Sequence, residues 1–375
     1  MNIQRILEKK LIEAIEKGRD AVILYGPRQA GKTTLIERVL ESLKLKALVL
    51  SGDDVRVQEE LSQHHLDFLK KKLGKSQLLV IDEAQRINNI GLTLKLLHDQ
   101  LKVKLFVSGS SSFELANRLN EPMTGRTRTF TLYPLAYSEI KPLLFEKPKE
   151  QLEEILRFGM YPRVWTLETE KEKEEYLRDL LNNYLYKDIL IFEKIRKPKK
   201  VLDLLTLLAL QIGSEVKISE LATQLGISQQ TVEIYLDALE KMFVIVNLRG
   251  FSRNLRSEIA KTSKYYFVDI GLRNALIGNF SQLKLRDDTS RLFENWFIIE
   301  RLKLQFNKQL YANQYFWRTY EQNEIDLIEE RSGKLFAYEC KWQVKKKINA
   351  PALWKKTYLN SIFKTVNSEN YPKFL

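Results

Sequence analysis

One segment near the start of the chain limits the fold more than any other. The apolar run Ala21 to Tyr25 is followed directly by Gly26-Pro-Arg-Gln-Ala-Gly31-Lys32-Thr33-Thr34, and helix-forming residues come next. This segment fits the pattern GxxxxGK[ST] in the place that the pattern requires, between a buried strand and a helix. Backbone N–H groups of such a loop surround phosphate groups, and the start of the helix adds a positive partial charge. The sequence therefore predicts a phosphate-binding loop (P-loop) at the edge of a parallel sheet.

Every position of this loop is predicted to contact a nucleoside triphosphate. Lys32 is expected to reach the β- and γ-phosphates and to take part in catalysis, and the Thr33 hydroxyl is expected to bind Mg²⁺. The predicted ligands are therefore ATP and Mg²⁺. The residues predicted to bind the nucleotide are Gly26, Pro27, Arg28, Gln29, Ala30, Gly31, Lys32, Thr33 and Thr34.

A second apolar run ends in two carboxylates. Leu78-Leu-Val-Ile-Asp82-Glu83 predicts a strand with Asp82 at the metal and Glu83 beside it, where Glu83 polarises the attacking water. A further strand, Lys46 to Leu50, is expected to be placed between the P-loop and Asp82. Both features indicate the ASCE branch of P-loop ATPases, near the AAA+ type.

Two later segments supply further candidate catalytic residues. The apolar run Lys104 to Ser108 continues as Gly-Ser-Ser-Ser112, and Ser108 and Ser110 are predicted to place a hydroxyl near the γ-phosphate. A serine-rich turn at the end of a strand explains the same residues without that role. Arg126 is expected to stabilise charge on the γ-phosphate, in its own or in a neighbouring subunit, or else to anchor its own loop.

Several motifs together resemble one family. Asp82-Glu-Ala-Gln85, Ser108-Gly-Ser-Ser, Thr124-Gly-Arg126, Tyr133-Pro-Leu-Ala-Tyr-Ser-Glu139 and Gly159-Met-Tyr-Pro162 are similar to the prokaryotic AAA-type ATPases that carry a C-terminal domain of unknown function. The resemblance covers nearly the whole chain. It implies an ATPase core, a winged helix and a nuclease-like C-terminal fold, and it supplies no physiological role.

Length and strand spacing predict a multidomain chain. At 375 residues the chain is longer than one hydrophobic core usually supports. Short strands alternate with helix-length segments as far as Tyr133, which predicts an α/β core with a parallel sheet. The predicted domains are a P-loop ATPase core (1–140), a helical lid or connector (141–200), a winged helix (201–270) and an α/β domain resembling the PD-(D/E)XK nucleases (271–375).

The composition excludes several classes of protein. Because Cys340 is the single cysteine, neither an intramolecular disulfide nor a zinc site with several thiolates can form. The start of the chain lacks the apolar stretch of a secretory signal, and the most apolar run, Val201 to Ile212, is shorter than the ~20 residues that span a bilayer. We therefore expect a cytoplasmic protein without membrane contact. Assembly into a homo-oligomer is left open.

The net charge points to a polyanionic partner. With 61 Lys and Arg against 48 Asp and Glu, the chain carries a net charge of +13, which favours nucleic acid. The second helix of the predicted winged helix presents Glu233, Asp237 and Glu240, so base reading by that helix is not expected. The wing is predicted to contact the phosphate backbone or to serve a structural role between domains. Its basic residues are Arg249, Arg253, Arg256, Lys261 and Lys264.

The C-terminal segment contains an acidic pattern that resembles the PD-(D/E)XK nucleases. Glu294 lies on a predicted amphipathic helix and Asp326 within a predicted strand, while Glu339 and Lys341 share one face of a later strand. Two carboxylates would hold Mg²⁺, Lys341 would orient water or stabilise the reacting phosphate, and Lys345 to Lys347 would lie nearby. A salt-bridged Glu-x-Lys on a solvent face explains the strand as well.

Taken together, these features predict an ATP-driven switch or motor that controls a basic, nuclease-like module acting on nucleic acid. The alternative is an ATP-gated signalling or binding regulator without nuclease activity.

Overall fold

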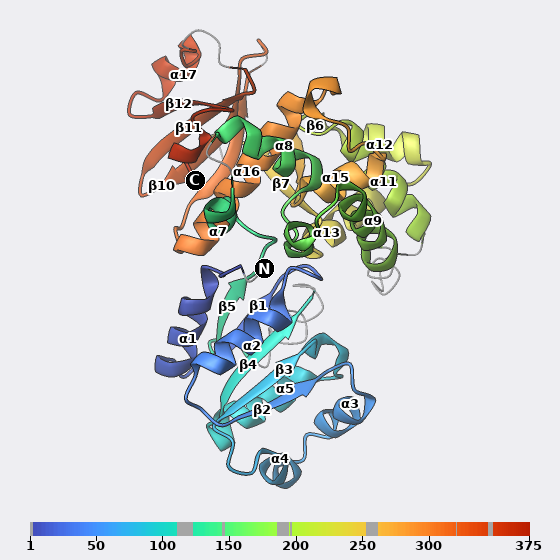
Figure 1. Ribbon diagram of the computed structural model, residues 1–375, viewed down its shortest axis with the longest axis vertical. Helices are drawn as coiled ribbons and strands as arrows, with labels where there is room; N and C mark the ends of the chain where they lie inside the picture. The colour runs from blue at the N-terminus through green and yellow to red at the C-terminus, as the bar shows by residue number, and fades with distance from the viewer. Residues whose placement is uncertain are drawn as a thin grey trace. The chain divides into compact units, whose positions relative to one another are not determined.

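The computed structural model describes residues 3–110, 123–144, 147–185, 195, 197–252, 262–319, 321–343 and 348–375. The chain divides into two compact units. We call residues 2–135 with 241–243 the N-terminal unit, and residues 136–240 with 244–375 the C-terminal unit. Each unit has its own β-sheet (Figure 1). In the described ranges, no helix is both long enough and apolar enough to cross a membrane.

The N-terminal unit is built on a five-stranded parallel sheet in the order β2-β3-β4-β1-β5. In the sheet, β4 lies between the P-loop strand β1 and the Asp82 strand β3, and β2 is an edge strand. We expected the segment Lys46 to Leu50 to lie between the P-loop strand and the Asp82 strand, and this expectation is wrong. Long crossover connections allow the order of parallel strands in a sheet to differ from their order in the chain. The strands are β1 (Ala21–Tyr25), β2 (Ala47–Ser51), β3 (Leu78–Asp82), β4 (Lys104–Gly109) and β5 (Thr127–Thr131).

Helices cover both faces of this sheet, as Figure 1 shows. Alternate residues of β1 divide between two apolar cores: Val22 and Leu24 pack with α1 and α2, whereas Ile23 and Tyr25 pack with α3, α4 and α5. Because both faces are buried, β1 and β3 are continuous apolar runs, and their carboxyl ends meet at one edge. The helices are α1 (Leu7–Lys17), α2 (Lys32–Ser42), α3 (Val55–Ser62), α4 (Leu66–Leu73), η1 (Ala84–Arg86), α5 (Ile90–Leu96) and η2 (Leu97–Leu101).

The C-terminal unit contains one seven-stranded mixed sheet in the order β12-β11-β10-β9-β7-β8-β6. The helices surrounding it in the chain are α7 (Tyr137–Ile140), η3 (Lys141–Leu143), α8 (Pro148–Phe158), η4 (Pro162–Thr166), α9 (Glu170–Leu180), η5 (Leu181–Leu185), α11 (Pro198–Leu210), α12 (Ile218–Leu225), α13 (Gln229–Lys241), α15 (Ile270–Ile277), η6 (Leu283–Leu285), α16 (Thr289–Lys308), α17 (Ala352–Thr357) and η7 (Tyr371–Lys373). The strands are β6 (Glu215–Val216), β7 (Ile245–Gly250), β8 (Ser263–Phe267), β9 (Asn313–Arg318), β10 (Glu324–Arg331), β11 (Lys334–Lys341) and β12 (Ile362–Asn367).

The seven-stranded sheet runs across the boundary predicted at residue 270. Strand β7 pairs in parallel with β9, with Arg249 opposite Tyr315 and Gly250 opposite Phe316. The antiparallel strands β6, β8 and β7 therefore continue into β9–β12 without a break. The packing joins these three segments into one compact unit. Their division into a connector, a winged helix and a separate C-terminal domain stays a prediction.

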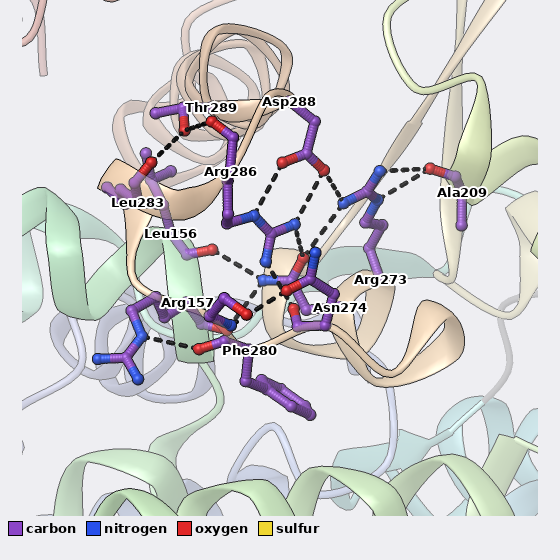
Figure 2. A network of polar contacts seen from close by, with 12 residues as sticks. Leu156, Arg157, Ala209, Arg273, Asn274, Phe280, Leu283, Arg286, Asp288 and Thr289 are labelled. Atoms are coloured by element: carbon purple, nitrogen blue, oxygen red, sulfur yellow. Dashed lines mark hydrogen bonds and ion pairs between the residues drawn. The ribbon is translucent and has the colours of Figure 1, made fainter.

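A buried network of polar side chains ties the same three segments together (Figure 2). Arg273 on α15 donates to the backbone carbonyl of Ala209 and, at 2.5 Å, to Asp288. Arg286 also donates to Asp288, at 2.8 Å. The neighbouring side chain, Asn274, donates to the carbonyls of two residues at the end of α8. Burial alone would raise the pKa of Asp288, but hydrogen bonds from Arg286 and Arg273 outweigh it and lower this pKa to about 2.

Candidate functional site

The P-loop connects the carboxyl end of β1 to the start of α2. Gly26 lies against the chain that follows β5, where a Cβ atom would come within 2.2 Å of the Leu132 carbonyl oxygen. Gly31, directly before α2, has φ +92°, and Gln29 has φ +59°, which is strained for a residue with a Cβ atom. The loop therefore has the left-handed turns that aim successive N–H groups into one concave site.

Lys32 lies over this loop. Its side chain is buried, and its ammonium group donates to the carbonyl oxygens of Gly26 at 2.9 Å and Pro27 at 3.1 Å. Arg5 braces the loop as well, because its guanidinium donates to the carbonyls of Ala30 at 2.7 Å and Tyr133 at 2.6 Å. Sequence reasoning missed Arg5, since no motif contains a residue so far ahead of the strand.

The Asp82 carboxylate lies next to Thr33 at the edge of the sheet. The Thr33 hydroxyl donates to Asp82 Oδ2 at 2.9 Å, the Glu83 backbone N–H donates to Oδ1 at 3.1 Å, and the buried Ser108 hydroxyl donates to Oδ1. A hydroxyl and a carboxylate this close are the oxygen ligands that Mg²⁺ prefers. The residues present therefore fit the predicted magnesium site. Ser108 touches Asp82 in this arrangement.

Glu83 follows Asp82 with a left-handed backbone, φ +51°. Its carboxylate accepts a hydrogen bond from the side-chain amide of Gln85, which also donates to the Ser110 hydroxyl at 3.0 Å. Behind Glu83 lies Gly52, where a Cβ atom would come 2.3 Å from the Glu83 carbonyl oxygen. Sequence reasoning gave Gly52 no role, although a glycine directly after a strand is the available signal.

Arg126 lies beside the first residue of β1, whereas the P-loop follows the last residue of that strand. Its backbone carbonyl accepts from Ala21 N–H at the start of β1, and its guanidinium pairs with Asp99 at 2.9 Å. The P-loop begins after Tyr25, at the other end of β1, roughly 13 Å away at ~3.3 Å per strand residue. We therefore correct the assignment of Arg126 to the γ-phosphate of its own P-loop. A role in a neighbouring subunit stays a prediction, and the contacts fit an anchor for its own loop.

The Glu294 carboxylate of α16 is held by residues of β8. It accepts a hydrogen bond from Tyr266 Oη at 2.6 Å and lies 3.7 Å from Lys264 Nζ. Lys264 also pairs with Glu324 and is 1% exposed, so it belongs to the interior and not to a basic wing surface. Arg253, Arg256, Lys261 and Lys345 to Lys347 lie outside the described residues.

The remaining predicted nuclease residues lie on β10 and β11. Asp326 accepts a hydrogen bond from Cys340 N–H at 2.7 Å, and Glu339 forms an ion pair with Lys341 at 2.6 Å. Burial, together with the carboxylates of Glu294 and Glu339, raises the pKa of Asp326 well above its ordinary value. Burial also raises the pKa of Glu294, against the effects of Lys264 and Tyr266. These carboxylates therefore interact unfavourably with one another.

The fit of this acidic set to a metal ion is poor. Among the residues that the structure describes, no group of three or more His, Cys, Asp or Glu side chains is placed to hold a metal. One reason is that neighbouring groups already engage the carboxylates: Tyr266 and Lys264 for Glu294, the backbone of Cys340 for Asp326, and Lys341 for Glu339. The alternative interpretation, a salt-bridged Glu-x-Lys on a solvent face, agrees with the observed ion pair. It does not agree with the burial of Glu339, whose side chain is 13% exposed.

Three family models match parts of the chain. Residues 18–141 match an AAA domain, residues 149–283 match a domain of unknown function (DUF8612), and residues 289–365 match another domain of unknown function (DUF4143). An uncharacterized protein of Mycobacterium tuberculosis is 28% identical over 325 residues, which are 85% of this chain and 70% of that protein. One of Methanocaldococcus jannaschii is 25% identical over 360 residues, 90% of this chain and 77% of that protein.

One solved structure has a similar fold. A Walker-type ATPase of Pyrococcus abyssi superposes with a TM-score of 0.51 at 17% identity, over 72% of this chain and 94% of that one. At this identity the similarity concerns the fold. Together with the P-loop, the Asp82-Glu83 pair and the sheet order, the comparisons identify residues 18–141 as an AAA-type P-loop ATPase domain.

Proposed function

We propose that the chain is a magnesium-dependent ATP hydrolase whose ATP cycle controls its C-terminal unit. One observation carries the hydrolase assignment: Thr33 and Asp82 are joined by a 2.9 Å hydrogen bond at the sheet edge where Lys32 covers the P-loop and Glu83 follows Asp82. The groups required for binding phosphate, holding a metal and orienting water thus lie at one place.

The steps follow from what these side chains can do. The Lys32 ammonium exchanges the carbonyls of Gly26 and Pro27 for phosphate oxygens, which carry full negative charge and bind it more strongly. Thr33 and Asp82 would hold a Mg²⁺ ion, which would supply positive charge to the phosphate oxygens when bound. Glu83 accepts a hydrogen bond from the attacking water and orients it toward the γ-phosphate.

Two substitutions separate binding from hydrolysis. Lys32→Ala should weaken the binding of a fluorescent ATP analogue, while Glu83→Gln should bind it normally and lose turnover by ~100-fold or more. Lys46→Ala, close to β2 and outside the loop, serves as the matched control. Equal loss of nucleotide affinity in Lys32→Ala and Glu83→Gln, with both proteins folded, would contradict the role given to Glu83.

We propose nucleic acid as the partner of the C-terminal unit. The net charge of the whole chain, +13, supports a polyanionic partner. The order α11, β6, α12, α13, β7, β8, with β6-β8-β7 paired antiparallel, is the order of elements in a winged helix and supports nucleic acid as that partner. On α13, Glu233 and Asp237 are exposed and would repel phosphate groups in a major groove. Backbone contact without base reading is therefore the mode that fits these residues.

Between the two roles considered for the C-terminal unit, binding without cleavage fits the described contacts better, because the acidic residues are engaged by protein groups. One observation favours the second role, metal-dependent cleavage. Burial and the carboxylates of Glu294 and Glu339 raise the pKa of Asp326, and such clusters of like charge occur at functional sites. Incubation of labelled DNA and RNA with Mg²⁺ or Mn²⁺ decides between them. Cleavage that Asp326→Asn abolishes would establish the nuclease, and intact substrate that is still bound would establish the regulator.

A further inference from the structure

Gln85 joins the ends of two neighbouring strands beside the P-loop strand. It lies in η1, directly after the Asp82-Glu83 pair, and its side chain is only 4% exposed. Its amide nitrogen, Nε2, donates to Glu83 Oε2, which follows β3, and to Ser110 Oγ, which follows β4. A single amide group thereby connects Glu83 to the end of β4.

The orientation of this amide is set by its neighbours. A carboxylate accepts hydrogen bonds and donates none, so the amide must present its nitrogen, and not its oxygen, to Glu83. The oxygen, Oε1, is then buried, and none of the described residues donates a hydrogen bond to it. A residue whose only role is packing needs no amide at this position. The two hydrogen bonds that the amide donates, to Glu83 and to Ser110, therefore indicate a functional role.

Glu83 is constrained in two further ways. Its backbone has φ +51°, and Gly52 packs against its carbonyl with no room for a Cβ atom. The backbone constraints fix where the Glu83 side chain begins, and the Gln85 amide fixes where its carboxylate ends. A group that orients a water molecule gains its effect from such a fixed position, since small displacements slow the reaction strongly.

We propose that Gln85 is a positioning residue for ATP hydrolysis: it holds the Glu83 carboxylate in the orientation that activates the attacking water and links that orientation to Ser110. This inference rests on the proposed hydrolase function. Gln85 does not touch the nucleotide in this role, so its loss changes turnover and leaves nucleotide affinity unchanged. Because Ser110 shares the same amide, its hydroxyl supports the hold on Glu83 indirectly.

The test replaces Gln85 with Met, which has similar volume and lacks the amide. We expect turnover to fall ~10- to 100-fold, the KM for ATP and the affinity for N-methylanthraniloyl-ADP to change less than ~2-fold, and the melting temperature to stay equal or rise. Gln77→Met is the matched control, because Gln77 is exposed and precedes β3 at the end away from Asp82. Ser110→Ala should show a smaller fall in turnover of the same kind.

A double variant gives the second measurement. If Gln85 acts through Glu83, then Glu83→Gln with Gln85→Met should be no slower than Glu83→Gln alone. Wild-type turnover in Gln85→Met, beside an inactive Glu83→Gln, overturns the inference and leaves the hydrolase standing. A lowered melting temperature together with lost nucleotide binding in Gln85→Met overturns it in favour of a structural role. Absence of turnover in the wild-type protein removes the hydrolase proposal and this inference together.

Discussion

Replacing Asp288 with Asn removes a negative charge that two buried guanidinium groups share. Arg273 and Arg286 have side chains that are 2% and 0% exposed, and they approach the Asp288 carboxylate at 2.5 and 2.8 Å. Asn keeps the shape of the side chain and loses the charge. Breaking a buried ion pair by removing one partner destabilises a protein by about 3–5 kcal/mol, because the remaining charge is left uncompensated.

The lowered pKa of Asp288 gives a second, independent value for this loss of stability. The folded chain holds this pKa at about 2, against an ordinary value of 3.8. At about 1.4 kcal/mol per pKa unit, the ionised carboxylate contributes about 2 kcal/mol to the free energy of unfolding. The carboxylate side chain is 15% exposed, so solvent screening is limited. We therefore expect Asp288→Asn to lower the free energy of unfolding by about 2–4 kcal/mol at neutral pH.

The sign of the pH dependence follows from the lowered pKa. Since the folded-state pKa lies below the unfolded value, this stabilisation is fully present above the unfolded pKa near 3.8. It is lost as the pH falls through the folded pKa near 2. The difference in stability between the wild-type protein and Asp288→Asn should therefore be constant above about pH 5 and shrink below about pH 4.

Urea unfolding followed by tryptophan fluorescence measures the stability of the C-terminal unit selectively. All five tryptophans of the chain, at positions 165, 296, 317, 342 and 354, belong to the C-terminal unit. Asp287→Asn is the matched control, because it makes the same change at the exposed neighbouring position. If Asp288→Asn lowers the stability no more than Asp287→Asn does, or if the difference persists unchanged at pH 2.5, the reasoning from the buried network is refuted.

Three further changes have expected outcomes. Gly52→Ala places a Cβ atom 2.3 Å from the Glu83 carbonyl oxygen, so turnover should fall ~10-fold or more. Gly250→Ala, whose Cβ atom would meet nothing closer than 3.7 Å, is the control and should leave turnover unchanged; equal rates in both variants would show that Gly52 does not shape the site. Arg126→Ala should leave turnover within ~2-fold of wild type, since Arg126 pairs with Asp99. A large loss of turnover that depends on protein concentration would instead place Arg126 in the active site of a neighbouring subunit. Raising the salt concentration from 50 to 200 mM should weaken nucleic-acid binding at least ~10-fold through counterion release. Charge reversal of Arg253 and Arg256 should reduce the dependence of the affinity on salt, and an unchanged dependence would place the binding surface elsewhere.

The P-loop and the sheet strands could be predicted because each depends on local sequence. Strands β1 and β3 have the predicted bounds, since a fully buried parallel strand is a continuous apolar run with sharp ends. The order of the strands could not be predicted from the same residues, because crossover connections do not encode which strands become neighbours. The predicted position of Arg126 near the γ-phosphate of its own P-loop was wrong for a related reason. Only the parallel register of β1 with β5 reveals which edge of the sheet Arg126 occupies.

The roles of Gln85 and Arg5 depend on contacts between segments far apart in the chain. Gln85 meets Ser110 across 25 positions, and Arg5 meets Tyr133 across 128. A motif search finds residues by spacing along the chain, so it names Gln85 inside a motif without revealing its partners. The acidic residues of the C-terminal unit show the opposite difficulty. The sequence places Glu294, Asp326 and Glu339 in a pattern, and only the structure shows that protein groups already engage each of them.

The motifs that carry the family resemblance divide into those that serve chemistry and those that serve packing. Gly159 has φ +76° and no room for a Cβ atom, which would lie 2.3 Å from Asp269; that carboxylate accepts a hydrogen bond from Met160 N–H at 2.6 Å. The segment that follows α8 is therefore fastened to the start of α15. In the Tyr133 to Glu139 motif, Glu139 likewise caps its own short helix. Both motifs have structural causes within the fold, so their presence in a relative predicts this fold and carries no information about its substrate. Motifs at the P-loop edge, where Asp82, Glu83 and Gln85 lie, are the ones whose variation should change the reaction.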